Sequence, residues 1–186
     1  MAESPNGRRV LVAVVSGTLG ETIQAWRLAN DPEQARRLPP HATLNYWAPP
    51  IEEAEVLERQ VRHAFDRPIA VTLGSVHEFE NRDGTFFIEV QGTDELDAAR
   101  ARLYDGTHVQ LSGTPDFTWH VTCVRYPDDA KREELRANAQ VLTAQIAAAP
   151  TWTVDTVAWL ELRDGVYEPL AIWSLGSTRA DEDPGD

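Results

Sequence analysis

The sequence predicts an α+β fold of two pseudo-symmetric lobes, each an antiparallel sheet packed with helices, with a cleft between them. Three observations lead to this prediction. Segments rich in β-branched and aromatic residues alternate with segments of helical periodicity. The order of these segments recurs in the second half of the chain. The pattern His-x-Thr occurs once in each half, at His41-Ala42-Thr43 and His120-Val121-Thr122, and each copy lies in a predicted strand that lines the central cleft.

The first half alternates strands and helices. Proline removes a helix hydrogen bond, so the first helix is expected to break near Asp31-Pro32. The predicted elements are a buried strand at 8–15, a helix from Glu21 to about Leu38, the strand HATLNYW closed by Pro49-Pro50, a helix at 51–66, and strands at 69–79 and 85–90 that flank the hairpin turn Asn81-Arg82-Asp83-Gly84.

The second half repeats this order. The predicted elements are a helix at 94–104, the strand FTWHVTCVRY ending at Pro127, a helix at about 128–148, and the strands WTVDTVAWLEL and VYEPLAIWSL joined around Arg163-Asp164-Gly165. The helix at 128–148 is expected to present one apolar face, because Leu135, Ala139, Leu142 and Ile146 recur at helical spacing. A pseudo-twofold axis is expected to relate the two lobes.

Composition limits the classes of function. The 186 residues carry a formal net charge of −13, which disfavours long nucleic acids and anionic membranes but allows a small phosphorylated substrate in a local pocket. The lone cysteine, Cys123, excludes an internal disulfide. We expect a cytoplasmic monomer with a disordered N-terminus at 1–7, one bilobal domain at 8–176 and a disordered acidic tail at 177–186.

The two motifs suggest chemistry on a phosphodiester. Residues i and i+2 of a strand face the same side, so each motif presents an imidazole beside a hydroxyl. One histidine can take a proton from the attacking group while the other gives a proton to the leaving oxygen. Thr43 and Thr122 can donate hydrogen bonds to the non-bridging phosphate oxygens. This arrangement requires no metal and no cofactor.

The same residues allow other interpretations. The motif residues could be a buried, hydrogen-bonded histidine and a core threonine in each strand. Two histidines and an acid could bind zinc or iron, but no Asp or Glu stands at ligand spacing inside either motif. His63, His77 and His108 have no partner motif and are expected to be surface or structural residues. Cys123 is expected in the core, because it follows Thr122 on the opposite face of the strand.

The paired motifs in duplicated lobes resemble the two-histidine phosphoesterase superfamily, which includes the 2'-5' RNA ligases and cyclic nucleotide phosphodiesterases. The resemblance extends from Val10 to about Gly176. The strings LPPHATL and FTWHVTC are similar to those of small bacterial phosphoesterases.

The resemblance implies further site residues. It implies a phosphate contact for Arg125 and a stacking role for Tyr46, each five positions after its histidine. In a regular strand, a residue five positions after the histidine faces the opposite side of the sheet. A strand end or a bulge must therefore turn the side chains of Arg125 and Tyr46 toward the histidines. Asn45 and Trp47 have the matching parity and are alternative residues of the pocket wall.

The sequence therefore predicts a metal-independent phosphodiesterase that opens a 2',3'-cyclic phosphate, or a related cyclic or 2'-5' phosphodiester, on a nucleotide or RNA end. His41 and His120 form the acid/base pair, with His120 expected to activate water and His41 to protonate the leaving ribose oxygen. The alternatives are a non-catalytic nucleotide or phosphometabolite binding module and a 2'-5' RNA ligase or RNA-end-processing enzyme.

Overall fold

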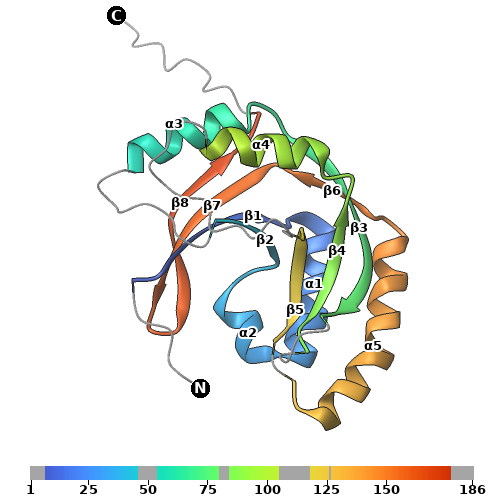
Figure 1. Cartoon of the computed structure of the whole chain (residues 1–186). Helices are drawn as coiled ribbons and strands as arrows, with labels where there is room; N and C mark the ends of the chain where they lie inside the picture. Colours follow the sequence, from blue (N-terminus) through green and yellow to red (C-terminus); the bar gives the residue numbers. More distant parts are fainter. Residues whose placement is uncertain (1–6, 46–53, 80–83, 105–117, 126, 177–186) are drawn as a thin grey trace, which may run out of the picture.

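The computed structural model describes residues 7–45, 54–79, 84–104, 118–125 and 127–176 (Figure 1). Most predicted helices and strands are found within a few residues of their expected bounds, and one predicted strand is divided in two. The helices are α1 (Gly17–Asn30), α2 (Pro32–Arg37), α3 (Ala54–Ala64), α4 (Asp94–Tyr104) and α5 (Asp129–Ala147). The strands are β1 (Arg9–Val14), β2 (His41–Asn45), β3 (Ile69–Glu78), β4 (Phe86–Gln91), β5 (His120–Val124), β6 (Thr151–Val154), β7 (Thr156–Arg163) and β8 (Val166–Ser174).

All eight strands belong to one antiparallel sheet, in the order β6-β3-β4-β5-β2-β1-β7-β8. The predicted mixture of helices and antiparallel strands is confirmed, but the prediction of a separate sheet in each lobe was wrong. The two motif strands, β2 and β5, pair with each other and join the halves into one sheet. This sheet is strongly curved (Figure 1).

The internal repeat is also divided differently from the prediction. Strand β4 was placed at the end of the first half, as the second arm of a hairpin. It does pair with β3, but it also lies beside β5, as β1 lies beside β2. The repeated order is therefore strand, helix, motif strand, helix, with β1 and β4 as the opening strands.

The predicted strand WTVDTVAWLEL is two strands in the structure. It divides at Asp155: β6, before this residue, pairs with β3 in one half of the sheet, and β7, after it, pairs with β1 in the other half. The Asp155 carboxylate accepts hydrogen bonds from the hydroxyls of Thr156 (2.9 Å) and Ser16 (3.3 Å). The alternation of polar and apolar residues ends at Asp155-Thr156, and an apolar run begins at Val157, so the sequence pattern does mark the division although the prediction did not use it.

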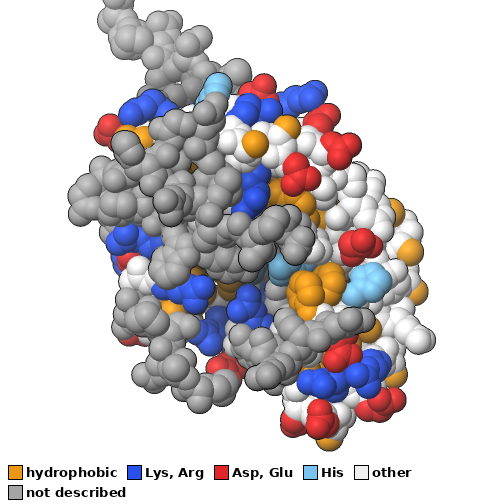
Figure 2. Space-filling view, in the orientation of Figure 1, with side chains coloured by type: hydrophobic (Ala, Val, Ile, Leu, Met, Phe, Trp, Pro, Cys, Tyr) orange, Lys and Arg blue, Asp and Glu red, His pale blue; other side chains and the backbone are white. Residues whose placement is uncertain are grey.

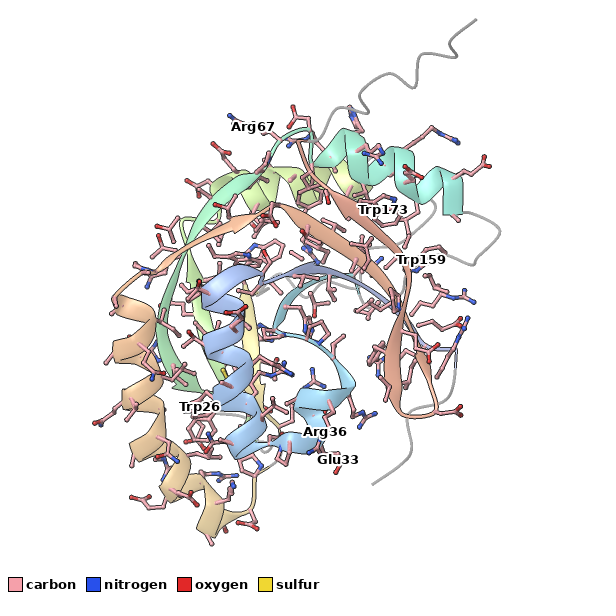
Figure 3. The ribbon with its side chains drawn as sticks, turned by 180° about the vertical axis from the view of Figure 1, so that it is seen from behind. Trp26, Glu33, Arg36, Arg67, Trp159 and Trp173 are labelled. Carbon is pink, nitrogen blue, oxygen red and sulfur yellow. The ribbon has the colours of Figure 1, made fainter. Side chains whose placement is uncertain are left out.

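The main hydrophobic core includes residues of α1, α3, α4 and α5. The predicted apolar face of α5 is confirmed, since Leu135, Ala139, Leu142 and Ile146 are all buried. Figure 3 shows Trp26 of α1 beside α5, where its indole N–H donates to the carbonyl of Asn138 (3.2 Å). Within the described ranges, no helix is long and apolar enough to cross a membrane.

The central strands present alternate residues to this core. Ala42 and Leu44 of β2 and Val121 and Cys123 of β5 all belong to the main cluster. The motif histidines and threonines occupy the intervening positions, so they face the opposite side of the sheet. The core thereby fixes which face of the sheet carries the candidate site.

Candidate active site

The two His-x-Thr motifs lie side by side at the centre of the sheet. Ala42 pairs with Val121 across the antiparallel strands, and these are the middle residues of the two motifs. A local twofold axis therefore passes between them. Continuing the register by one residue in each direction places His41 opposite Thr122 and Thr43 opposite His120. All four side chains project from one small area of the sheet.

His41 is buried, with 7% of its surface exposed. Two prolines precede it, and they hold the approaching chain in an extended conformation. Its Nδ1 lies 2.7 Å from the carbonyl oxygen of Pro39. A carbonyl oxygen can only accept, so Nδ1 carries the hydrogen and donates it. In the neutral ring, Nε2 then has a free lone pair.

His120 repeats this arrangement in the second motif. Its Nδ1 lies 2.8 Å from the carbonyl oxygen of Thr118, two residues earlier in the chain. The same argument places the hydrogen on Nδ1 and leaves Nε2 as the acceptor. His120 is less buried than His41. The two histidines are thus held by matching backbone contacts.

The surroundings keep both imidazoles neutral. Burial is the main cause that lowers the pKa of His41 to about 3, and the positive charges of Arg27 and Arg125 lower it further, as does His120. Burial also lowers the pKa of His120, with Arg125 contributing. The hydrogen bonds to Pro39 and Thr118 act in the opposite direction, because they stabilise the protonated rings.

The remaining predicted residues are placed as follows. Arg125 comes directly after β5, where the strand has ended, which removes the parity objection to its facing the histidines. Its backbone N–H donates to Asp31 Oδ2 (3.2 Å). Asn45 is the last residue of β2, on the face of His41, and is buried. Tyr46 and Trp47 lie outside the described residues.

An aromatic pair beside His120 was not predicted. Phe79 and Phe87 stack with their ring centroids 3.8 Å apart. The edge-on contacts with His120 have centroid distances of 5.1 Å for Phe79 and 5.7 Å for Phe87. Figure 2 shows a histidine in the middle of this face with hydrophobic side chains next to it. The sequence indicates the two strands, but it does not indicate that β4 lies beside β5.

Arg27 was also missed. It lies in α1, is 3% exposed, and its charge reaches His41. A single arginine in an amphipathic helix is typical of a solvent-facing residue, so no sequence signal identified it. Figure 2 shows further basic side chains around the centre of the face. Basic side chains therefore lie around the site, although the net charge of the chain is strongly negative.

The other candidate residues are separate from this quartet. His63 is exposed on α3, as expected. His77 is exposed on β3 but lies nearer the site than expected, 5.8 Å from the ring of Phe87 between centroids. His108 is outside the described residues. Cys123 is buried in the core as predicted, and burial raises the pKa of its thiol to about 12. Among the described side chains, no group of three His, Cys, Asp or Glu could hold a metal ion.

The geometry defines a site with two oriented imidazoles, two hydroxyls and nearby arginines, on a curved antiparallel sheet. A model of the 2'-5' RNA ligase superfamily matches residues 15–165. The chain belongs to this superfamily, which confirms the resemblance seen in the sequence. No curated protein matches the sequence.

Solved structures share the fold at low sequence identity. Apo LigT of E. coli is 16% identical, with a TM-score of 0.56 and coverage of 92% of this chain and 99% of that one. The protein TT0787 of Thermus thermophilus is 19% identical, with a TM-score of 0.59 and coverage of 90% and 97%. A protein described as a phosphoesterase is 17% identical, with a TM-score of 0.57 and coverage of 91% and 98%.

Proposed function

We propose that the protein is a metal-independent phosphodiesterase that opens a 2',3'-cyclic phosphate, or a related cyclic or 2'-5' phosphodiester, on a nucleotide or RNA end. One observation carries the proposal. Two imidazoles on adjacent strands each donate Nδ1–H to the carbonyl two residues earlier, so both present Nε2 for proton transfer. Such a pair can supply a base and an acid to one phosphorus atom.

The environments of the two rings support a division of roles. His41 is the more buried, and two arginines oppose its protonation. We therefore assign His41 as the base and His120 as the acid, which is the opposite of the order expected from the sequence. The Nε2 atom of His41 takes a proton from water as the water oxygen bonds to phosphorus. The bond from phosphorus to the ribose oxygen breaks, and that oxygen takes the proton from Nε2 of His120.

The substrate itself completes this acid/base pair. In the free protein, both pKa values are lowered, so both rings are neutral at pH 7. A bound phosphodiester brings a negative charge next to both rings and raises both pKa values, so His120, the less buried ring, can gain a proton and His41 becomes a stronger proton acceptor than in the free protein. After one turnover, His41 carries the proton and His120 is neutral, and exchange with water restores the starting state.

The remaining side chains hold the phosphate. The hydroxyls of Thr43 and Thr122 project from the same face as the histidines and can donate to the non-bridging oxygens. The guanidinium of Arg125 supplies positive charge near both rings. Charge on these oxygens grows as water attacks, so donors fixed in advance lower the barrier.

Two observations support a nucleotide as substrate. The stacked pair Phe79 and Phe87 borders His120 and offers an aromatic surface against which a base can pack. Among the similar structures, LigT of E. coli forms complexes with 3'-AMP and with ATP. The net charge of −13 favours a small nucleotide or a short RNA end over long RNA. A monomeric state and a cytoplasmic location remain predictions.

The test is hydrolysis of the four nucleoside 2',3'-cyclic monophosphates in the presence of EDTA. We expect turnover by the wild type and by His63→Ala, an exposed control on α3. His120→Ala should be slower by about 10²–10⁴-fold because it lacks one proton-transfer group. Circular dichroism establishes that both variants are folded.

Each other outcome has a definite meaning. Full activity in His120→Ala would contradict the mechanism. Nucleotide binding without turnover in the wild type would favour the non-catalytic binding module. Formation of 2'-5'-joined RNA, with binding that weakens as salt rises, would favour ligation.

A further inference from the structure

A buried arginine, Arg27, lies behind the first motif, and within the part of the chain that the structure describes its guanidinium bonds only neutral acceptors. Arg27 donates through Nη1 to Leu38 O (2.9 Å) and Gln24 Oε1 (2.9 Å), and through Nη2 to Gln34 O (3.4 Å). Its Nε finds no hydrogen-bond partner among the described residues. Burying a charged group against neutral acceptors costs free energy that the rest of the fold must offset.

The contacts of Arg27 lead to His41. Leu38 directly precedes Pro39, whose carbonyl accepts the hydrogen of His41 Nδ1. Two prolines make the intervening backbone stiff. Because this backbone is stiff, the position of the Leu38 carbonyl fixes the position of the Pro39 carbonyl. The Pro39 carbonyl in turn sets the orientation and the tautomer of the imidazole.

Asp31 connects the same turn to the second motif strand. Its Oδ1 accepts from the backbone N–H of Gln34 (3.2 Å) and caps α2. Its Oδ2 accepts from the backbone N–H of Arg125 (3.2 Å), the residue that follows β5. Asp31 N–H in turn donates to the carbonyl of Arg27. One turn thus contacts the approach to His41 and the end of the strand that carries His120.

We propose that Arg27 and Asp31 are positioning residues, Arg27 orienting His41 through Leu38 and Pro39, and Asp31 fixing the end of the His120 strand through Arg125. The inference rests on the proposed function, because two-histidine chemistry needs both rings aligned on one phosphorus atom. Burial lowers the pKa of the Arg27 guanidinium, and the negative charge of Asp31 acts in the opposite direction.

The test is nitrogen-detected NMR of the histidine rings in the free protein, which reports tautomer and titration for each ring and needs no substrate. The variants are Arg27→Met, Arg27→Lys and Asp31→Asn, with His41→Gln used to assign the His41 signals. Asparagine retains one carbonyl oxygen for the cap of α2 but cannot accept a second bond with its amide nitrogen.

Two control variants make the same substitutions at similar contacts in other helices. Arg102 of α4 donates through Nε and Nη2 to the carbonyl of Ala64, so Arg102→Met removes a similar guanidinium-to-backbone contact. Asp128 caps α5 by accepting from the N–H of Lys131 (2.7 Å). Asp128→Asn therefore repeats the cap substitution at a helix that does not precede a motif.

In Arg27→Met we expect the single Nδ1–H tautomer of His41 to become a mixture and its titration to move upward from about pH 3, since a repelling charge is lost. Arg27→Lys should retain the low titration while the tautomer mixture persists, because an ammonium group cannot hold two carbonyls with the same planar geometry. In Asp31→Asn the His120 signals should shift. Neither control should change these signals.

An unchanged His41 tautomer in Arg27→Lys would overturn the role of Arg27, and this variant decides the point if Arg27→Met does not fold. Unchanged His120 signals in Asp31→Asn would overturn the role of Asp31. These readouts are independent of turnover. If the wild type hydrolyses no cyclic phosphate, the proposed function fails while the spectra still decide the positioning roles.

Discussion

His41 is both buried and held in one orientation by the backbone. It is almost fully buried, and its ring is held in one tautomer by a single backbone carbonyl. Burial gives the ring a fixed position, but it also makes protonation costly. The result is a group that remains a neutral base across the physiological pH range.

This burial predicts a specific dependence of stability on pH. The pKa of His41 is about 3 in the folded protein and 6.5 in its reference state. Between these values the unfolded chain binds a proton that the folded chain excludes, so stability decreases as pH falls through this window. From pH 7 to pH 5 this contribution amounts to about 2 kcal/mol.

Urea unfolding at the two pH values measures this contribution. The wild type should lose about 2 kcal/mol more than His41→Gln over that interval, because glutamine does not titrate. His63→Gln, which changes an exposed histidine, should behave like the wild type. Equal losses in the wild type and His41→Gln would show that His41 is not held neutral by burial.

The sequence identified the motif residues but not the residues that surround them in the site. His-x-Thr in a strand predicts an imidazole and a hydroxyl on one face, and the structure places all four of these residues together. Arg27 was missed because burial of a helical arginine depends on what packs over it. Phe79 and Phe87 were missed because their closeness to His120 depends on the pairing of β4 with β5.

The hairpin arms β3 and β4 lead to a prediction about substrate affinity. Phe79 follows β3 and stacks on Phe87 of β4 beside His120. Stacking of a base on an aromatic ring contributes about 1–3 kcal/mol. Phe79→Ala should therefore raise KM for a nucleoside cyclic phosphate by about tenfold with little change in kcat.

Steady-state kinetics with two variants examine this role. Phe79→Tyr keeps the ring and should retain the KM of the wild type. A KM that is unchanged in Phe79→Ala would place the base elsewhere. A loss confined to kcat would instead indicate that Phe79 acts by packing against His120.

The turn between β7 and β8 predicts an effect on stability alone. Asp164 and Gly165 both have positive φ, at 46° and 83°, as a two-residue hairpin turn requires. No atom lies within 4 Å of a Cβ added at Gly165, so the cost of Gly165→Ala is purely conformational. We expect a loss of about 1–2 kcal/mol in the free energy of unfolding.

Chemical denaturation of this variant and of Asp164→Asn separates the two turn positions. Asparagine tolerates positive φ, so Asp164→Asn should be nearly neutral. Catalytic parameters should be unchanged in both. A neutral Gly165→Ala would mean that the turn relaxes to another conformation.

Local elements were predicted well, since they depend on periodicity and turn chemistry. The break of the first helix at Asp31-Pro32 and the apolar face of α5 are both present. The division of a strand at Asp155 was missed, although the alternation of β6 gives way there to the apolar run of β7; the different partners of the two strands depend on long-range pairing.

The architecture of the entire chain follows from one long-range pairing. Two motif strands from different halves align through Ala42 and Val121 and convert two expected sheets into one. Sequence periodicity carries no information about which strands become neighbours. The repeat therefore placed one motif strand in each half, but it assigned β4 to the wrong half.

The net charge predicts the size of the substrate. With a charge of −13, the protein lacks the overall attraction for phosphate chains that RNA-binding proteins show. A labelled single-stranded RNA of about 40 nucleotides should give no binding at about 10 µM protein in physiological salt. Tight binding that weakens with salt would contradict this expectation and favour RNA ligation.

The paired action of the two histidines can be measured with a double-mutant cycle. His41→Ala, His120→Ala and the double variant are compared with the wild type on the preferred 2',3'-cyclic nucleotide in EDTA. If both rings serve one reaction step, each single variant loses about 10²–10⁴-fold and the double variant is scarcely slower than the slower single one. Additive losses, or full activity in either single variant, would contradict two-histidine catalysis at this site.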